Sequence, residues 1–159
     1  MQRISLAASL LLFALLGGCA STVTTGMSRE EVLSRLGQHP RIVTTPQGLR
    51  FQYSRQPAGQ SAVMVDFDAS GRVVSAREVM TLSELMRIEP GKWTRADVER
   101  EFGPPARVDR VGSWSGDVMN YRWRGIQDDM LFFVYLDQAQ VVRRTQQGPD
   151  YQPDIRDRN

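Results

Sequence analysis

The sequence predicts an α+β fold of two tandem units, each with short helices packed on a three- to four-stranded antiparallel sheet. Two observations carry this prediction. A short capped-helix motif occurs twice, at 26–37 and at 91–103, and each copy is followed by strand-like segments in the same order. The copies also share one offset of 66 positions, seen for Ser28 and Thr94, Gly37 and Gly103, and Arg41 and Arg107. A single offset across helix cap, helix stop and strand start indicates a repeat.

Composition limits the kinds of partner and site that this chain can have. The chain has 159 residues, enough for one domain or two small ones, and its 41% apolar and 24% charged residues can support a core. The net charge is only +2 and no basic stripe stands out, so we expect no nucleic-acid partner. Cys19 is the single cysteine and His39 the single histidine, which excludes an intramolecular disulfide, a Cys/His zinc site and a Cys–His catalytic pair in the folded part.

Residues 1–18 have the parts of a signal peptide. Arg3 supplies the positive start, and an apolar run follows over 4–16. This run is shorter than the roughly 20 residues that span a bilayer, which argues against a permanent transmembrane helix.

The end of this leader predicts a lipid anchor. Leu16, Gly17, Gly18 and Cys19 resemble a bacterial lipobox, in which the cysteine thiol is acylated and the leader is removed before it. Several acyl chains give stable anchoring. The alternative is an ordinary cleaved signal with an incidental cysteine. By resemblance, Ala20 in place of an aspartate points to the outer membrane, with 19–25 as a short tether.

The first unit is predicted over 26–80. Ser28 and Glu31 form a capping box, Met27 and Val32 a hydrophobic staple, and Gly37 ends the helix. Alternating segments then predict strands at 41–45, 49–54, 62–68 and 72–79. On the third of these, Val63, Val65 and Phe67 are expected to face inward, and Met64, Asp66 and Asp68 outward.

The second unit is predicted over 81–147. A short helical segment at 81–88 precedes the repeated helix, which Thr94 and Asp97 cap. Strands are expected at 107–111, 119–124, 131–136 and 141–145, with Tyr121 and Trp123 matching Phe51 and Tyr53. The polar segment 148–159 is expected to be a disordered tail.

The two units differ on one strand. Where the first unit has Met64 and Asp66, the second has Phe133 and Tyr135, next to Leu131. A strand that is apolar on both faces is usually buried on both faces. Leu131, Phe133 and Tyr135 therefore either pack against the other unit or form an exposed patch that docks a partner.

Nothing in the sequence predicts an enzyme, a cofactor or a metal site. His39 lies in a loop that has no histidine in the second unit, and the serines have no recognisable histidine partner. The aspartate pairs at 66 and 68 and at 128 and 129 lack a third oxygen-rich segment nearby, so we interpret them as solvated surface and turn residues.

The motif from Gly26 to Gly37, with strands that end in Asp-x-x-Gly-x-Val, resembles the BamE (SmpA/OmlA) family over most of 26–145. That resemblance implies a small outer-membrane lipoprotein with helices on an antiparallel sheet. Such proteins are accessory factors of the machine that inserts β-barrel proteins, and their fold is also that of the β-lactamase inhibitor proteins.

These patterns lead to one functional expectation and one alternative. We expect an outer-membrane-anchored periplasmic lipoprotein that acts as a protein-binding module in outer-membrane or β-barrel protein assembly or in envelope integrity. Its partners would be the outer membrane, through the lipid anchor, and envelope proteins, with the β-barrel assembly complex as a candidate. The alternative is a protein inhibitor that covers an enzyme's active site with its concave sheet.

Overall fold

The computed structural model describes residues 23–151. The predicted signal peptide, the lipobox and Cys19 lie outside this range, as do residues 152–159. Within 23–151, no helix has the length and apolar character needed to cross a membrane.

The chain forms two four-stranded antiparallel sheets with a few short helices, which confirms the predicted α+β fold with two sheet units. Strands follow one another in chain order within each sheet. The first unit contains α1 (Arg29–Leu36), β1 (Arg41–Thr45), β2 (Gly48–Ser54), β3 (Ala62–Phe67) and β4 (Val73–Glu78). The second contains α2 (Leu82–Leu85), α3 (Arg95–Phe102), β5 (Arg107–Asp109), β6 (Val118–Arg124), β7 (Asp129–Leu136) and β8 (Val142–Pro149).

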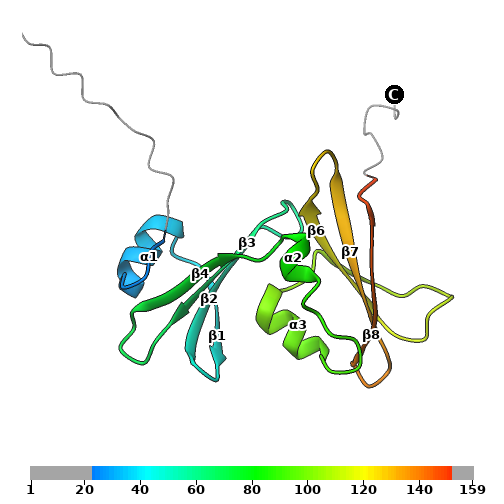
Figure 1. The fold of residues 1–159 in the computed structure, drawn as a ribbon, viewed down its shortest axis with the longest axis horizontal. Coiled ribbons are helices and arrows are strands. Elements are labelled where there is room, and N and C mark those ends of the chain that lie inside the picture. Colours follow the sequence, from blue (N-terminus) through cyan, green and yellow to red (C-terminus); the bar gives the residue numbers. More distant parts are fainter. Residues whose placement is uncertain (1–22, 152–159) are drawn as a thin grey trace, which may run out of the picture.

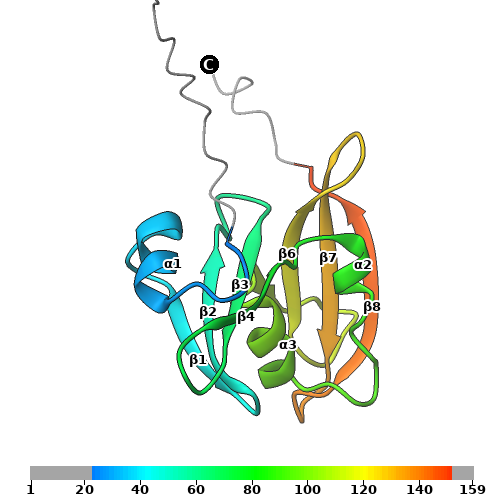
Figure 2. The same cartoon turned by 60° about the vertical axis from the view of Figure 1, so that its left-hand side comes forward.

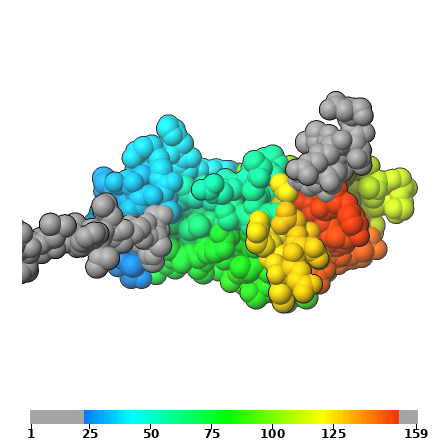
Figure 3. Space-filling model, turned by 90° about the horizontal axis from the view of Figure 1, so that it is seen from above, coloured from blue at the N-terminus to red at the C-terminus, as the bar shows by residue number. Residues whose placement is uncertain are grey.

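The elements stack in four layers. Helix α1 lies on one side of the sheet β1–β4 (sheet 1), while α2 and α3 lie between that sheet and the sheet β5–β8 (sheet 2) (Figures 1 and 2). The two units sit next to one another along the long axis, with α1 and β8 toward opposite ends (Figure 3). The helices of the second unit are therefore sandwiched between two sheets.

The repeated helices begin and end where the sequence predicts. The Glu31 carboxylate accepts from the Ser28 amide at 2.7 Å, while Ser28 Oγ accepts from the Glu31 amide at 3.2 Å. Thr94 and Asp97 form the same capping box on α3. Gly37 and Gly103 then adopt φ of 115° and 79°, a backbone conformation that favours glycine and stops each helix.

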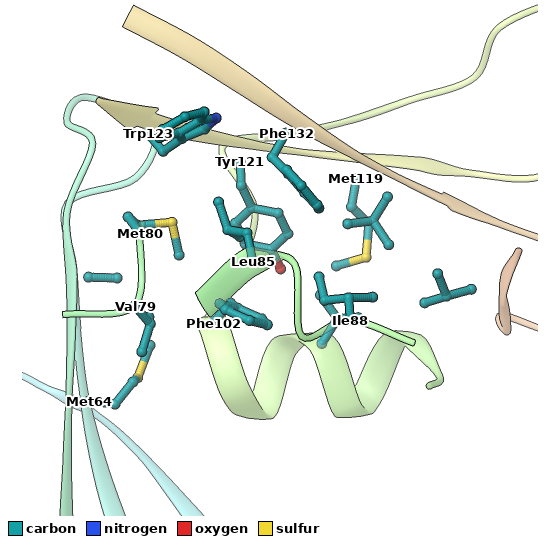
Figure 4. Packing of buried hydrophobic residues seen from close by; sticks show 14 of the residues in the cluster. Met64, Val79, Met80, Leu85, Ile88, Phe102, Met119, Tyr121, Trp123 and Phe132 are labelled. Atoms are coloured by element: carbon teal, nitrogen blue, oxygen red, sulfur yellow. The ribbon is translucent and has the colours of Figure 1, made fainter. Parts of the chain in front are cut away.

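Two apolar cores hold the layers together. Val32 of α1 packs against sheet 1 in a small core with Phe51, Val65, Phe67 and Val73. The larger core belongs to both units, because Met64, Val79 and Met80 of the first unit join residues of α2, α3 and sheet 2 (Figure 4). The units thus share one hydrophobic interior.

Met64 corrects one prediction. Alternation placed it on the outward face of its strand, but it is fully buried in the shared core. Sheet 1 carries α1 on the Val65 side and α3 on the Met64 side, so β3 is the strand that is buried on both faces. The sequence could not show this, because the covering helix belongs to the other unit.

The last strand is also longer than predicted. Strand β8 continues to Pro149, where Met130 pairs with Pro149 and Leu131 with Gly148. The Arg122 guanidinium then meets the Asp150 carboxylate at 2.6 Å. The expected tail boundary at residue 148 therefore falls inside the sheet.

Candidate functional site: the outer face of the second sheet

The contact between α3 and sheet 1 shows how this fold uses a sheet face. The side-chain amide of Gln52 on β2 donates to the carbonyls of Glu99 and Arg100 at 3.0 and 2.8 Å. Arg50, two residues away, donates to the same Arg100 carbonyl at 3.0 Å. The last carbonyls of a helix lack intrahelical donors and carry the negative end of its dipole. Sheet 1 therefore caps the C-terminal end of α3.

Buried charges reinforce this contact. Arg50 is only 6% exposed, and its guanidinium pairs with Asp66 at 2.6 Å and with Glu101 of α3 at 2.9 Å. Burial acts to raise the pKa of Asp66, but hydrogen bonds from Arg50 and Ser75 outweigh it and hold the pKa below its ordinary value. Asp66 is thus an ionised structural partner of Arg50, rather than the solvated surface residue that the sequence suggested.

A pair of tyrosines fixes which residues of the two sheets are equivalent. The Tyr53 hydroxyl donates to the Gly37 carbonyl at 3.1 Å, and the Tyr121 hydroxyl to the Gly103 carbonyl at 2.9 Å. Tyr121 therefore corresponds to Tyr53, and the predicted match of Trp123 with Tyr53 is wrong by two residues. With this alignment Gln52 corresponds to Asn120 and Arg50 to Val118.

Register shifts in the two sheets show how β3 aligns with β7. The β3–β4 register shifts between Asp66 and Phe67, and the β7–β8 register shifts between Tyr135 and Leu136. These shifts match Phe67 to Leu136. Residues Ala62, Met64 and Asp66, over which α3 lies, then correspond to Leu131, Phe133 and Tyr135. The three residues singled out in the sequence occupy the positions that receive a helix in the first unit.

On sheet 2 those positions form what we call the outer face, the side that bears Leu131, Phe133 and Tyr135. All three are partly exposed, while Phe132, Val134 and Leu136 between them are buried in the shared core. The core between the units therefore lies on the opposite side of β7. Among the described residues no helix covers the outer face (Figure 1). Its use for docking a partner stays a prediction.

An arginine and two aromatic rings organise one end of this face. The Tyr135 and Trp114 rings meet edge to face, with centroids 5.3 Å apart, and Trp114 Nε1 donates to the Leu136 carbonyl. The Arg144 guanidinium lies 3.9 Å from the Tyr135 ring centroid and 5.5 Å from that of Trp114. These cation–π contacts hold Arg144 on the face.

Asn120 lies at the centre of the outer face and is 1% exposed. It is one methylene shorter than Gln52, and its amide nitrogen donates within its own sheet, to the Val118 and Arg107 carbonyls and to Asp109. Its buried Oδ1 has no donor among residues 23–151. The corresponding oxygen of Gln52 accepts from Arg41 at 3.2 Å.

The remaining candidate groups lie apart from this face. His39 is exposed at the rim of a cleft of about 620 Å³ that Arg41, Gln52, Tyr53 and Pro104 also line. Asp68 accepts three hydrogen bonds from Ser70 and Arg72 in its turn, and Asp129 pairs with Arg124. Within the described part of the chain, no group of three or more His, Cys, Asp or Glu is placed to hold a metal ion.

Comparison with known proteins does not assign this chain to a family. No protein-family model matches the chain, and no curated protein matches it significantly. A solved structure that does match is a DUF4309 family protein, YjgB, from Bacillus subtilis. It is 13% identical, covers 77% of this chain and 78% of its own, and has a TM-score of 0.31. A likeness this distant indicates no function.

These findings correct the identification with the BamE family. No family model matches the chain, and the solved structure reported above is described as a DUF4309 family protein. The capping boxes, staples and glycine stops that suggested BamE are general features of short helices on sheets. The β-barrel assembly role and the inhibitor alternative came from that resemblance, and they lose their support with it.

Proposed function

We propose that this protein is a lipid-anchored, protein-binding module of the bacterial outer membrane, facing the periplasm. The anchor is Cys19, and the binding surface is the outer face of sheet 2. The observation that carries the proposal is the difference between the sheets, because among residues 23–151 sheet 1 has helices on both sides and sheet 2 has them on one side (Figure 1).

The sequence supports the anchor. Leu16, Gly17 and Gly18 stand directly before the single cysteine of the chain, at the end of an apolar leader. Acylation there would hold the folded units close to the membrane, because α1 begins only ten residues beyond Cys19.

The composition of the outer face supports a binding role. It presents Leu131, Phe133 and Tyr135 next to Trp114 and Arg144. Aromatic residues and arginine are enriched in protein interfaces and dominate their energetics. The described residues form no catalytic constellation on this face, so binding is the activity that its chemistry supports best.

Replacing the cysteine tests the anchor. We expect the native chain to incorporate labelled palmitate and to fractionate with the outer membrane. Cys19→Ser should lose the label and leave the outer-membrane fraction, whereas Ala20→Asp should keep the label and move to the inner membrane. Recovery of Cys19→Ser in the outer membrane would show that the anchor is wrong.

A further inference from the structure

The inter-unit contact gives a template for what the outer face of sheet 2 binds. On sheet 1, the arginines of the docking face each meet a carboxylate of α3. Arg50 and Arg77 lie 2.9 and 3.9 Å from Glu101, and Arg41 lies 3.8 Å from Glu99. In this fold, therefore, the centre of a sheet face contacts a helix through apolar side chains. Near the end of the helix, carboxylates of the helix pair with arginines of the sheet.

Sheet 2 repeats the apolar centre of this arrangement, but Val118 stands where sheet 1 has Arg50. Leu131, Phe133 and Tyr135 stand where Ala62, Met64 and Asp66 lie under α3, and they are larger and more apolar. The Phe133 ring lies against Gly148, where an added Cβ would come within 3.4 Å of it, so the ring is supported from the neighbouring strand. The face is a preformed apolar platform.

Arg144 gives the outer face an exposed cation at a position where sheet 1 has none. It is exposed on β8 opposite Tyr135 and is held by ring contacts, and no ion pair forms with it among residues 23–151. On sheet 1 the equivalent residue is Ser75, which donates to Asp66. In the first unit, therefore, the carboxylate of Asp66 is paired inside its own sheet. In the second unit, the cation of Arg144 is exposed on the sheet face.

A second copy of this chain is a poor occupant. The helix that would take the place of α3 is α1, its repeat equivalent. Where α3 has Glu101, α1 has Arg35, and where α3 has Glu99, α1 has Leu33. Docked in this way, α1 would offer Arg144 no carboxylate at either position and a cation at one of them, and like charges in an interface are unfavourable.

We propose that the outer face of sheet 2 binds an amphipathic α-helix of a different envelope protein, laid across it as α3 lies across sheet 1. The apolar side of that helix packs on Leu131, Phe133 and Tyr135. An Asp or Glu near its C-terminal turn pairs with Arg144. This inference rests on the proposed function and names the partner's binding element.

Photo-crosslinking in the native host tests the proposal with the full anchored chain. Benzoylphenylalanine replaces Phe133, and for comparison it replaces Val74, which is 48% exposed on β4. We expect an adduct from position 133 only. Mass spectrometry should map it to a segment of another protein with apolar residues at i, i+3 or i+4 spacing and an acidic residue within one turn.

Charge reversal provides the matched control. Arg144→Glu should lower the yield of this adduct about tenfold, because it turns an attractive pair into a repulsive one. Arg143→Glu makes the same charge change at the next residue, which is exposed and paired with Asp137, and should leave the yield within about twofold.

Several results would overturn the inference. These are an adduct to the chain itself (a second copy or residues 152–159), an adduct to lipid, a yield at position 133 no greater than at 74, and a yield unaffected by Arg144→Glu. Fractionation of the same cells separates the two proposals. If the protein is absent from the outer membrane, the proposed anchor fails; if it is present and one of these results occurs, the partner helix alone fails.

Discussion

At the scale of single residues, Arg50 explains most about how the units are joined. A buried charge is costly unless it is paired and hydrogen-bonded. Arg50 has Asp66 in its own sheet, and Glu101 and the Arg100 carbonyl in the other unit. Its energetic role is therefore to couple the units. Removal of its charge would take away the cation that pairs with Asp66 and the nearest of the three arginines around Glu101, which would keep Arg100 at 3.5 Å and Arg77 at 3.9 Å.

Arg50→Met should lower the free energy of unfolding by about 3 kcal/mol, the cost of breaking a buried ion pair from one side. Urea unfolding of the purified protein measures this. Lys92→Met is the control, because the Lys92 side chain is 73% exposed and its pair with Glu89, inside the second unit, is worth less than about 1 kcal/mol. Equal losses for the two variants would contradict the coupling role.

Residues with local roles could be predicted from the sequence, and residues with distant partners could not. Ser28, Thr94, Gly37 and Gly103 act within one turn of chain, so their spacing identified them. Arg50, Gln52 and Met64 alternate like the polar side of any half-buried strand, and their partners lie about 40 to 50 residues away. No periodic pattern encodes such a contact.

At the scale of elements, the equivalent tyrosines show how far the repeat is preserved. Each tyrosine hydroxyl donates to the glycine that ends the preceding helix. The environments differ, since Tyr121 is fully buried in the shared core and Tyr53 is partly exposed. Burial also raises the pKa of Tyr121 well above its ordinary value, so this hydroxyl stays a donor.

Tyr121→Phe should cost about 1.5 kcal/mol of stability, because the Gly103 carbonyl would lose its donor in a buried site. Tyr53→Phe removes the same hydroxyl at a site where water can replace it, and should cost less than about 0.5 kcal/mol. Thermal unfolding of the two variants makes the comparison. A larger loss for Tyr53→Phe would contradict the burial of Tyr121.

Neighbouring phenylalanines on β7 test the two sides of sheet 2. Phe132 is 1% exposed in the shared core, so Phe132→Asp should unfold the protein at 25 °C. Phe133 lies on the outer face, so Phe133→Asp should change stability by about 1 kcal/mol or less. Circular dichroism measures both. Unfolding of Phe133→Asp would identify the outer face as part of a core.

At the scale of the whole molecule, stacking determines which surface is left for function. Two sheets have four faces, and α1, together with the α2–α3 layer between the sheets, covers three of them. The sequence predicted two units and singled out Leu131, Phe133 and Tyr135. It could not tell whether these residues faced the other unit, because the order of the layers depends on contacts between units rather than on periodicity within a strand.

Carbene footprinting of the purified protein tests this arrangement most directly, because a diazirine reagent labels accessible side chains of any type. Met64 and Phe133 occupy equivalent positions and differ in whether a helix covers them. We expect strong labelling at Phe133 and Tyr135 and protection at Met64 and Ala62. Protection at Phe133 equal to that at Met64, or labelling at Met64, would contradict a fold in which α3 completes sheet 1 and leaves the outer face of sheet 2 open.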